Sequence, residues 1–105
     1  MTTEEFVKAF YNEKQYFLKE YLSENSKTDV GEWIKSLNLD EQQFEILKKI
    51  LDGSFTDIFY SILLGLDGSA SIGGIQEVYD LKDENGNQLS GEIEGYAYDY
   101  FHREK

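Results

Sequence analysis

Residues 63–81 read LLGLDGSASIGGIQEVYDL, and the character of the chain changes within this stretch. An apolar run of helical periodicity ends in four glycines within ten positions, and an extended segment follows. The glycines are Gly65, Gly68, Gly73 and Gly74. The stretch is therefore either a loop that cradles a phosphate or cofactor, or a corner that joins a helix to a strand.

The glycine spacing matches neither of two common phosphate-binding motifs. A Walker A loop requires lysine and Ser or Thr after its last glycine, but here Ile75 and Gln76 follow Gly74. A dinucleotide fingerprint needs G-x-G-x-x-G between a strand and a helix, whereas here the helix comes first and that spacing is absent. We interpret the glycines as a corner where positive φ is allowed, and we predict no cofactor.

Two amphipathic helices are predicted near the N-terminus. Thr2 and Glu5 have capping-box spacing, and the apolar side chains that follow favour a helix over residues 3–22. A polar break then separates this segment from a short helix, which Asp29 is placed to cap.

Two more helices are predicted before the glycine corner. Asp40 repeats the capping-box spacing and begins a third helix, which we expect to stop at Asp52-Gly53. Ser54 then begins a fourth, strongly apolar helix that continues to Leu66.

Beyond the corner the pattern changes to strands and then returns to a helix. Residues 75–81 are extended, an Asn-Gly turn follows, and residues 88–90 can return as a second strand. Apolar residues at helical spacing then predict a C-terminal helix after Gly91. The predicted class is α+β, mostly α, with residues 1–105 as a compact single domain of about four helices, a β-hairpin near residues 75–90 and a C-terminal helix.

Composition indicates a folded protein of the cytoplasm. Hydrophobic residues make up 40% of the 105 residues and aromatic residues 15%, which is typical of a chain with a packed core. The absence of cysteine excludes disulfides and thiolate metal sites. The longest apolar stretch, residues 58–66, is too short to span a bilayer, and the acidic start MTTEEF is unlike a secretory signal.

The formal net charge of −11 is unevenly distributed along the chain. Between Asp52 and Phe101 there are ten acidic residues against one basic residue, Lys82, while the remainder has eleven acidic and nine basic residues. Such a field repels nucleic acid and anionic membranes and attracts basic surfaces. We therefore predict a basic protein partner, with no direct binding to nucleic acid and no membrane association.

Acidic and aromatic residues alternate near the C-terminus, where residues 92–102 read EIEGYAYDYFH. Tyrosine supplies rigid contact area and a carboxylate pairs with lysine or arginine, so this combination suits an interface with a basic partner. The alternative is a solvated helix face with its tyrosines packed on the core. The predicted partner-binding residues are Asp67, Asp80, Asp83, Glu84, Glu92, Glu94, Tyr98 and Asp99.

No catalytic constellation is evident, so we predict that the protein is not an enzyme. His102 is the one histidine, and without cysteine or a second histidine no nucleophile–base pair can be assembled. A small hydrolase that uses two convergent carboxylates is the enzymatic alternative.

A calcium-binding loop is a further alternative for residues 83–94, DENGNQLSGEIE. Asp83, Asn85 and Asn87 stand at loop positions 1, 3 and 5, and Glu94 stands at position 12. However, position 6 requires glycine and is Gln88. We favour an ordinary Asn-Gly hairpin over this metal site.

Charge and size together suggest an acidic binding module that acts as an inhibitor. By analogy with nuclease-toxin immunity proteins, such a module would neutralise a basic partner such as a nuclease or a DNA-binding protein, and would itself be a monomer or a weak homodimer. A structural subunit that associates through an apolar patch around Trp33 is the remaining alternative.

Overall fold

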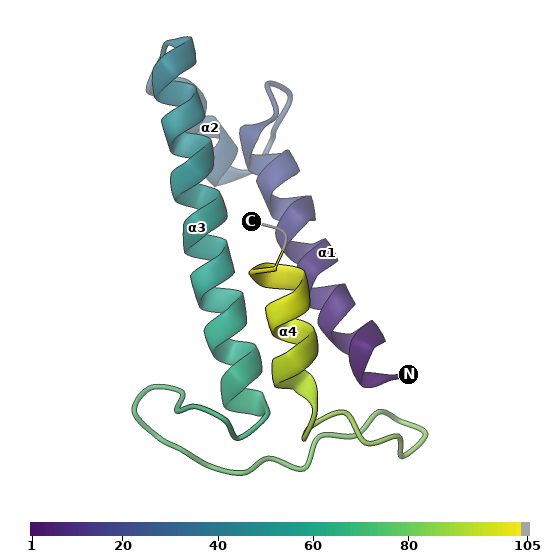
Figure 1. Cartoon of the computed structure of the whole chain (residues 1–105). Coiled ribbons are helices and arrows are strands. Elements are labelled where there is room, and N and C mark those ends of the chain that lie inside the picture. The colour runs from purple at the N-terminus through teal and green to yellow at the C-terminus, as the bar shows by residue number, and fades with distance from the viewer. Residues whose placement is uncertain (104–105) are drawn as a thin grey trace.

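The computed structural model describes residues 1–103, and these residues form four helices (Figure 1). The helices are α1 (Thr3–Leu22), α2 (Asp29–Ser36), α3 (Glu41–Leu66) and α4 (Ile93–Phe101). Helices α1 and α3 run antiparallel along the length of an elongated molecule with extents of 47 × 28 × 25 Å. Helix α2 packs against α1, and α4 packs against both α1 and α3 at the opposite end.

The predicted helix starts are largely confirmed by their caps. The Thr2 hydroxyl accepts from the N–H of Glu5, whose carboxylate accepts from the N–H of Thr2, so a full capping box opens α1. Asp40 forms the same reciprocal pair at the start of α3. Helix α2 differs by one residue, because the N-cap is Thr28 rather than Asp29.

The predicted third and fourth helices are one continuous helix, α3. The expected break at Asp52-Gly53 is wrong, and the reason lies in contacts with α1 on both sides of the glycine. Asp52 pairs with Lys14 at 2.7 Å, and Phe55 packs against Tyr21 with ring centroids 6.0 Å apart. Packing of this kind outweighs the cost of a glycine inside a helix, which is about 1 kcal/mol.

The glycine corner ends α3 as predicted. Asp67 is the C-cap, and Gly68 follows with a φ of 78°. The N–H of Gly68 donates to the carbonyl of Gly65, and the N–H of Ser69 donates to that of Leu64. This pair of bonds is a Schellman motif, in which glycine supplies the left-handed residue after the helix.

The predicted β-hairpin and the α+β class are wrong. Among residues 1–103 there is no sheet, and residues 67–92 form a long loop, here called the acidic loop. Its extended parts meet in two isolated bridges, between Ile72 and Ile75 and between Lys82 and Gln88. The described chain is therefore helical in class.

Side-chain bonds replace a strand ladder in the acidic loop. The Ser90 hydroxyl donates to the carbonyl of Tyr79 and accepts from the N–H of Leu81, at 2.8 and 3.0 Å. A two-stranded ribbon is marginal in water unless one face packs on other structure. Here Ile75 and Val78 remain exposed, and residues 75–81 do not form the paired strand that the sequence predicted.

The core lies where α4 meets α1 and α3. Its fully buried members are Val7 from α1, Leu63 from α3, and Ile93, Ala97 and Phe101 from α4. The helical spacing predicted after Gly91 is thus confirmed, and α4 supplies most of the core despite its nine residues. Helix α4 extends along only part of α1 and α3, as Figure 1 shows.

A helix that crosses a membrane must be both long and apolar. The longest helix, α3, has 26 residues but includes several charged side chains. Across residues 1–103, no helix combines the length and the apolar character needed to cross a bilayer.

Candidate functional site

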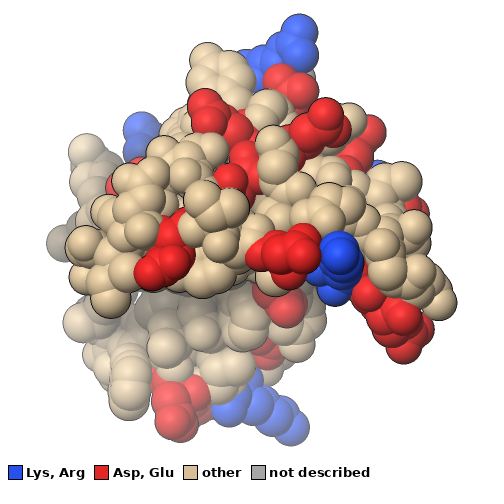
Figure 2. Space-filling view, turned by 90° about the horizontal axis from the view of Figure 1, so that it is seen from below, with Lys and Arg blue, Asp and Glu red and all other residues tan. Residues whose placement is uncertain are grey.

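The predicted partner-binding residues lie at one end of the molecule, in the acidic loop and α4. Figure 2 looks onto this end and shows carboxylates spread over it, with fewer basic side chains. Six of the predicted residues are exposed: Asp80, Glu84, Glu92, Glu94, Tyr98 and Asp99. The remaining two, Asp67 and Asp83, are partly withdrawn from solvent and have their carboxylates engaged within the molecule.

Asp67 links the end of α3 to the start of α4. Its carboxylate accepts from the main-chain N–H groups of Gly91 and Glu94. Glu92, the N-cap residue of α4, makes no side-chain capping bond, so Asp67 supplies that function from elsewhere in the sequence. The described structure thus gives Asp67 a role in positioning α4.

Asp83 organises the turn of the acidic loop. It accepts from the N–H groups of Asn85 and Asn87, from the Asn87 side-chain amide, and from the N-terminal ammonium of Met1 at 2.9 Å. The Asn87 amide and the ammonium group hold the pKa of the Asp83 carboxyl well below its usual range. The same ion pair raises the pKa of the Met1 amine and ties the N-terminus to the loop.

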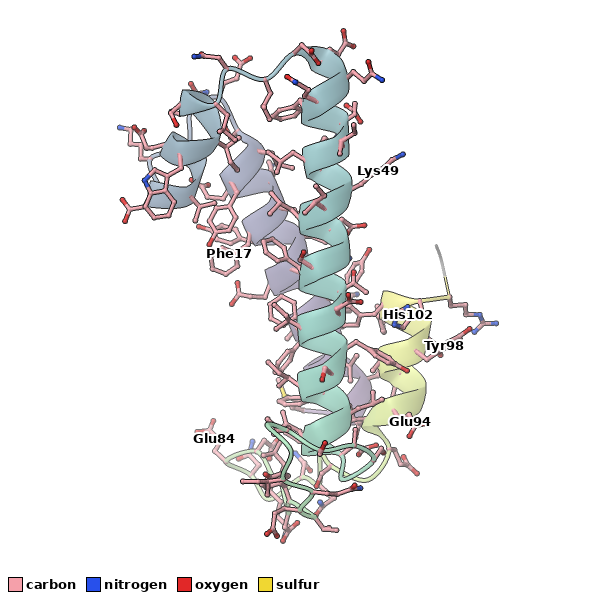
Figure 3. All side chains as sticks on the ribbon, turned by 90° about the vertical axis from the view of Figure 1, so that its left-hand side faces the viewer. Phe17, Lys49, Glu84, Glu94, Tyr98 and His102 are labelled. Carbon is pink, nitrogen blue, oxygen red and sulfur yellow. The ribbon has the colours of Figure 1, made fainter. Side chains whose placement is uncertain are left out.

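The exposed residues of this end do not form one continuous face. Figure 3 shows Glu84 on one side of the molecule, while Glu94 and Tyr98 line the opposite side along α4. The six exposed residues therefore divide between the acidic loop and α4, and one flat partner surface cannot cover all of them.

One side of α4 carries an aromatic cluster with nearby carboxylates. The His102 ring lies 4.3 Å from the Tyr60 ring of α3 and 5.9 Å from Tyr98. Burial, together with the charge of Glu94, raises the pKa of the Tyr60 hydroxyl. Sequence patterns gave no sign of Tyr60, because its proximity to Tyr98 depends on how α4 packs on α3.

The other side of α4 faces α1. The Tyr100 hydroxyl donates to Glu4 at 3.0 Å, and this bond raises the pKa of Tyr100. Asp99 pairs with Arg103 at 3.3 Å, one turn along the chain. The charge of Asp99 is thus partly balanced, which separates it from Glu94 and Tyr98.

The exposed segment, residues 75–80, is a further candidate, and Asp80 is its one member among the predicted partner-binding residues. Ile75 is 62% exposed and Val78 is 88% exposed, so two apolar side chains lie in water. The main-chain N–H and C=O groups of residues 76–78 make no hydrogen bond with any described residue. The apolar residues that led to the predicted strand over residues 75–81 are the signal that could have identified this segment as a contact surface.

The geometry offers no support for the calcium alternative. Within residues 1–103, no group of three or more His, Cys, Asp or Glu side chains is arranged to hold a metal ion. Of the four proposed ligands, Asp83 and Asn87 bond to each other, and the main chain of Glu94 is held by Asp67.

Comparison with known proteins gives no further identification. A scan against protein-family models and searches of curated proteins and of solved structures all find no match. Function is therefore inferred from the surface of this chain.

Proposed function

We propose that this protein is a non-enzymatic binding module that attaches to a basic protein through the acidic loop. The observation that carries the proposal is the exposed segment, where two apolar side chains and the unpaired main chain of residues 76–78 lie in water beside carboxylates. Apolar groups so exposed raise the free energy of the isolated protein, and a partner that covers them recovers about 25 cal/mol per Å².

The segment and its charges have complementary roles in this interaction. Val78 and Ile75 enter an apolar depression on the partner, and the unpaired main chain pairs with an edge strand beside it. Glu77, Asp80 and Glu84 are exposed and steer a basic surface towards the segment.

The same surface supports an inhibitory role. A cleft that binds phosphates presents lysine and arginine, so an acidic loop that fills it blocks access of nucleic acid. The partner class that fits best is a basic nuclease or DNA-binding protein, and neutralisation by occupancy needs no catalytic group on this chain.

The experiment is a capture from native lysate with three forms of the protein as bait. The first is wild type, the second is Glu77→Lys/Asp80→Lys/Glu84→Lys, and the third is Glu13→Lys/Glu24→Lys/Asp57→Lys. The two triple variants have the same net charge, and all six substituted side chains are exposed. Each captured protein is identified by mass spectrometry and then tested in purified form by calorimetry at low and high salt.

We expect one basic protein that binds wild type and the control variant, but binds the loop variant at least tenfold more weakly. Added salt should slow its association, because steering by exposed charges is screened. Equal binding by the two triple variants would overturn the assignment to the acidic loop. Failure of wild type to retain any basic protein would overturn the proposed function.

An exposed apolar patch around Trp33 favours a structural subunit as the second candidate. Trp33 is 66% exposed on α2, and Leu37 lies four residues further along and is also exposed. Light scattering of wild type and Trp33→Ser over a range of concentrations tests this candidate. Self-association that Trp33→Ser abolishes and that salt does not weaken would support it, and a monomer at all concentrations would oppose it.

A further inference from the structure

A groove between α1 and α3 continues beyond the point where α4 ends. It has a volume of about 660 Å³ and lies between the C-terminal half of α1 and the N-terminal half of α3. Leu18, Leu22 and Phe44 contribute apolar surface, and Lys19, Lys48 and Lys49 also line it. This space is here called the open groove.

We propose that the open groove is a docking site for an acidic amphipathic helix of a partner protein. Helix α4 indicates the shape of the occupant, because it packs between the same two helices and buries Ile93, Ala97 and Phe101 against them. In Figure 3, Lys49 lies on α3 beyond His102, which follows the last residue of α4.

A buried ion pair marks the boundary between the filled and the open parts. Lys14 of α1 is 2% exposed and pairs with Asp52 of α3 at 2.7 Å. Its ammonium group also lies 5.7 Å from the centre of the Phe101 ring, at the last residue of α4. Asp52 in turn lines the open groove, so the groove begins where the contacts of α4 finish.

The dimensions suit a short helical segment. The lining residues extend from Gln15 to Ser23 on one side and from Phe44 to Asp52 on the other. At about 1.5 Å rise per residue, each side is about 12 Å long, or roughly two helical turns. A partner helix would therefore place apolar residues at i, i+4 and i+8, the spacing that α4 itself uses.

The charges around the groove select an acidic occupant. Lys19 and Lys49 form no ion pair with any described residue, while Lys48 pairs with Glu45 at 3.5 Å. Asp52 is already engaged by Lys14. The lining thus has unpaired positive charge in a chain whose net charge is −11.

The overall negative charge does not prevent this interaction. The acidic loop lies at the opposite end of a molecule that is 47 Å long, whereas the Debye length at physiological salt is about 8 Å. A second copy of this chain is a poor occupant, because its α4 is buried in its own core. The occupant is therefore a helix from a different protein.

The test uses two 18-residue peptide probes with the same apolar positions, one with glutamate and one with lysine at the flanking positions. Binding is measured by fluorescence anisotropy, and the contact region is mapped by amide chemical shifts in the ¹⁵N-labelled full chain. We expect the glutamate peptide to shift amides of residues 15–23 and 44–52, and to bind at least tenfold more tightly than the lysine peptide.

Two matched double variants locate the charge effect. Lys19→Glu/Lys49→Glu should lower the affinity for the glutamate peptide at least fivefold. The control variant Lys8→Glu/Lys27→Glu has the same net charge and should change this affinity less than twofold. All four lysines are exposed, so circular dichroism should show unchanged helix content. Equal effects of the two variants, equal affinity for the two peptides, or no binding of either would each overturn the proposal. Protection of the groove in a dimer, without peptide binding, would assign it to a second copy and would also overturn it.

Discussion

The two ends of the α1/α3 pair differ in what fills the space between the helices. At one end α4 supplies three fully buried side chains and closes a core with Val7 and Leu63. At the other end the same two helices border the open groove, and the apolar side chains that line it, Leu18, Leu22 and Phe44, are only partly buried. The buried side chains of α4 therefore stabilise one end of the α1/α3 pair, while the space between the same two helices stays open at the other end.

The charged side chains also differ between the two ends. The acidic loop closes the end that contains the core, whereas the open groove is bordered by lysines at the far end. The two proposed binding sites therefore do not overlap. If packing by α4 stabilises one end, substitutions at the two ends should differ in their effect on the free energy of unfolding.

The largest difference should come from removing one phenyl ring at each end. Phe101→Ala removes a fully buried ring and should lower the free energy of unfolding by about 3–5 kcal/mol. Phe44→Ala removes a ring that is only partly buried and should cost about 1–2 kcal/mol, since less apolar area is lost. Urea denaturation measures both. If the two variants lost similar free energies of unfolding, the core end would not contribute more to stability than the end with the open groove.

A smaller difference is expected from the carboxylates that cap helices at the two ends. Asp67→Ala removes the bonds that position α4 and should cost about 1–2 kcal/mol. Asp40→Ala removes the cap of α3 at the open end and should cost about 0.5–1 kcal/mol. Hydrogen exchange provides the sharper measurement, because Asp67→Ala should accelerate exchange in α4. Unchanged α4 protection would show that Asp67 does not hold it.

The sequence predicted the helices well because their signals are local. Both capping boxes and the spacing of Ile93, Ala97 and Phe101 depend on residues three to eight positions apart, and the structure has all of them. The helix break predicted at Asp52-Gly53 is wrong because it was based on the local preference of glycine. Lys14 and Tyr21, which are distant in sequence, stabilise that part of α3.

The candidate site was harder to predict because its members depend on long-range contacts. Asp67 and Asp83 have the same residue type as Asp80 but bond to Gly91 and to Met1, which no local pattern indicates. The sequence predicted a paired strand over residues 75–81, and this prediction is wrong because these residues belong to no sheet. Pairing requires a partner strand with a packed face, and within residues 1–103 the acidic loop forms two isolated bridges instead.

The ion pair of Asp83 with the N-terminus should make stability depend on pH in two windows. A depressed carboxyl pKa stabilises the fold above the unfolded value of about 4, and this contribution is lost as the pH falls below it. A raised amine pKa stabilises the fold below about 8, and this contribution is lost as the pH rises through the folded pKa.

The Tm difference between wild type and Asp83→Asn should therefore be greatest between about pH 4 and pH 8 and should narrow on both sides. Acetylation of the N-terminus should remove the alkaline part and reduce the acid part, which the Asn87 amide still maintains through its bond to Asp83. A difference that stays constant from pH 3 to pH 10 would show that the pair does not contribute to stability.

The smallest effect on stability is expected from Val78→Ser in the exposed segment. Its side chain is 88% exposed and contributes nothing to the core around Val7, so the free energy of unfolding should change by less than about 0.5 kcal/mol. Under the proposed function, binding of the basic partner should nevertheless weaken at least fivefold, because that proposal places the lost methyl groups in the interface. Thermal unfolding and calorimetry on the same sample separate the two quantities. Since this variant leaves folding unchanged, unaltered binding would remove Val78 from the interface, and weaker binding could not be attributed to unfolding.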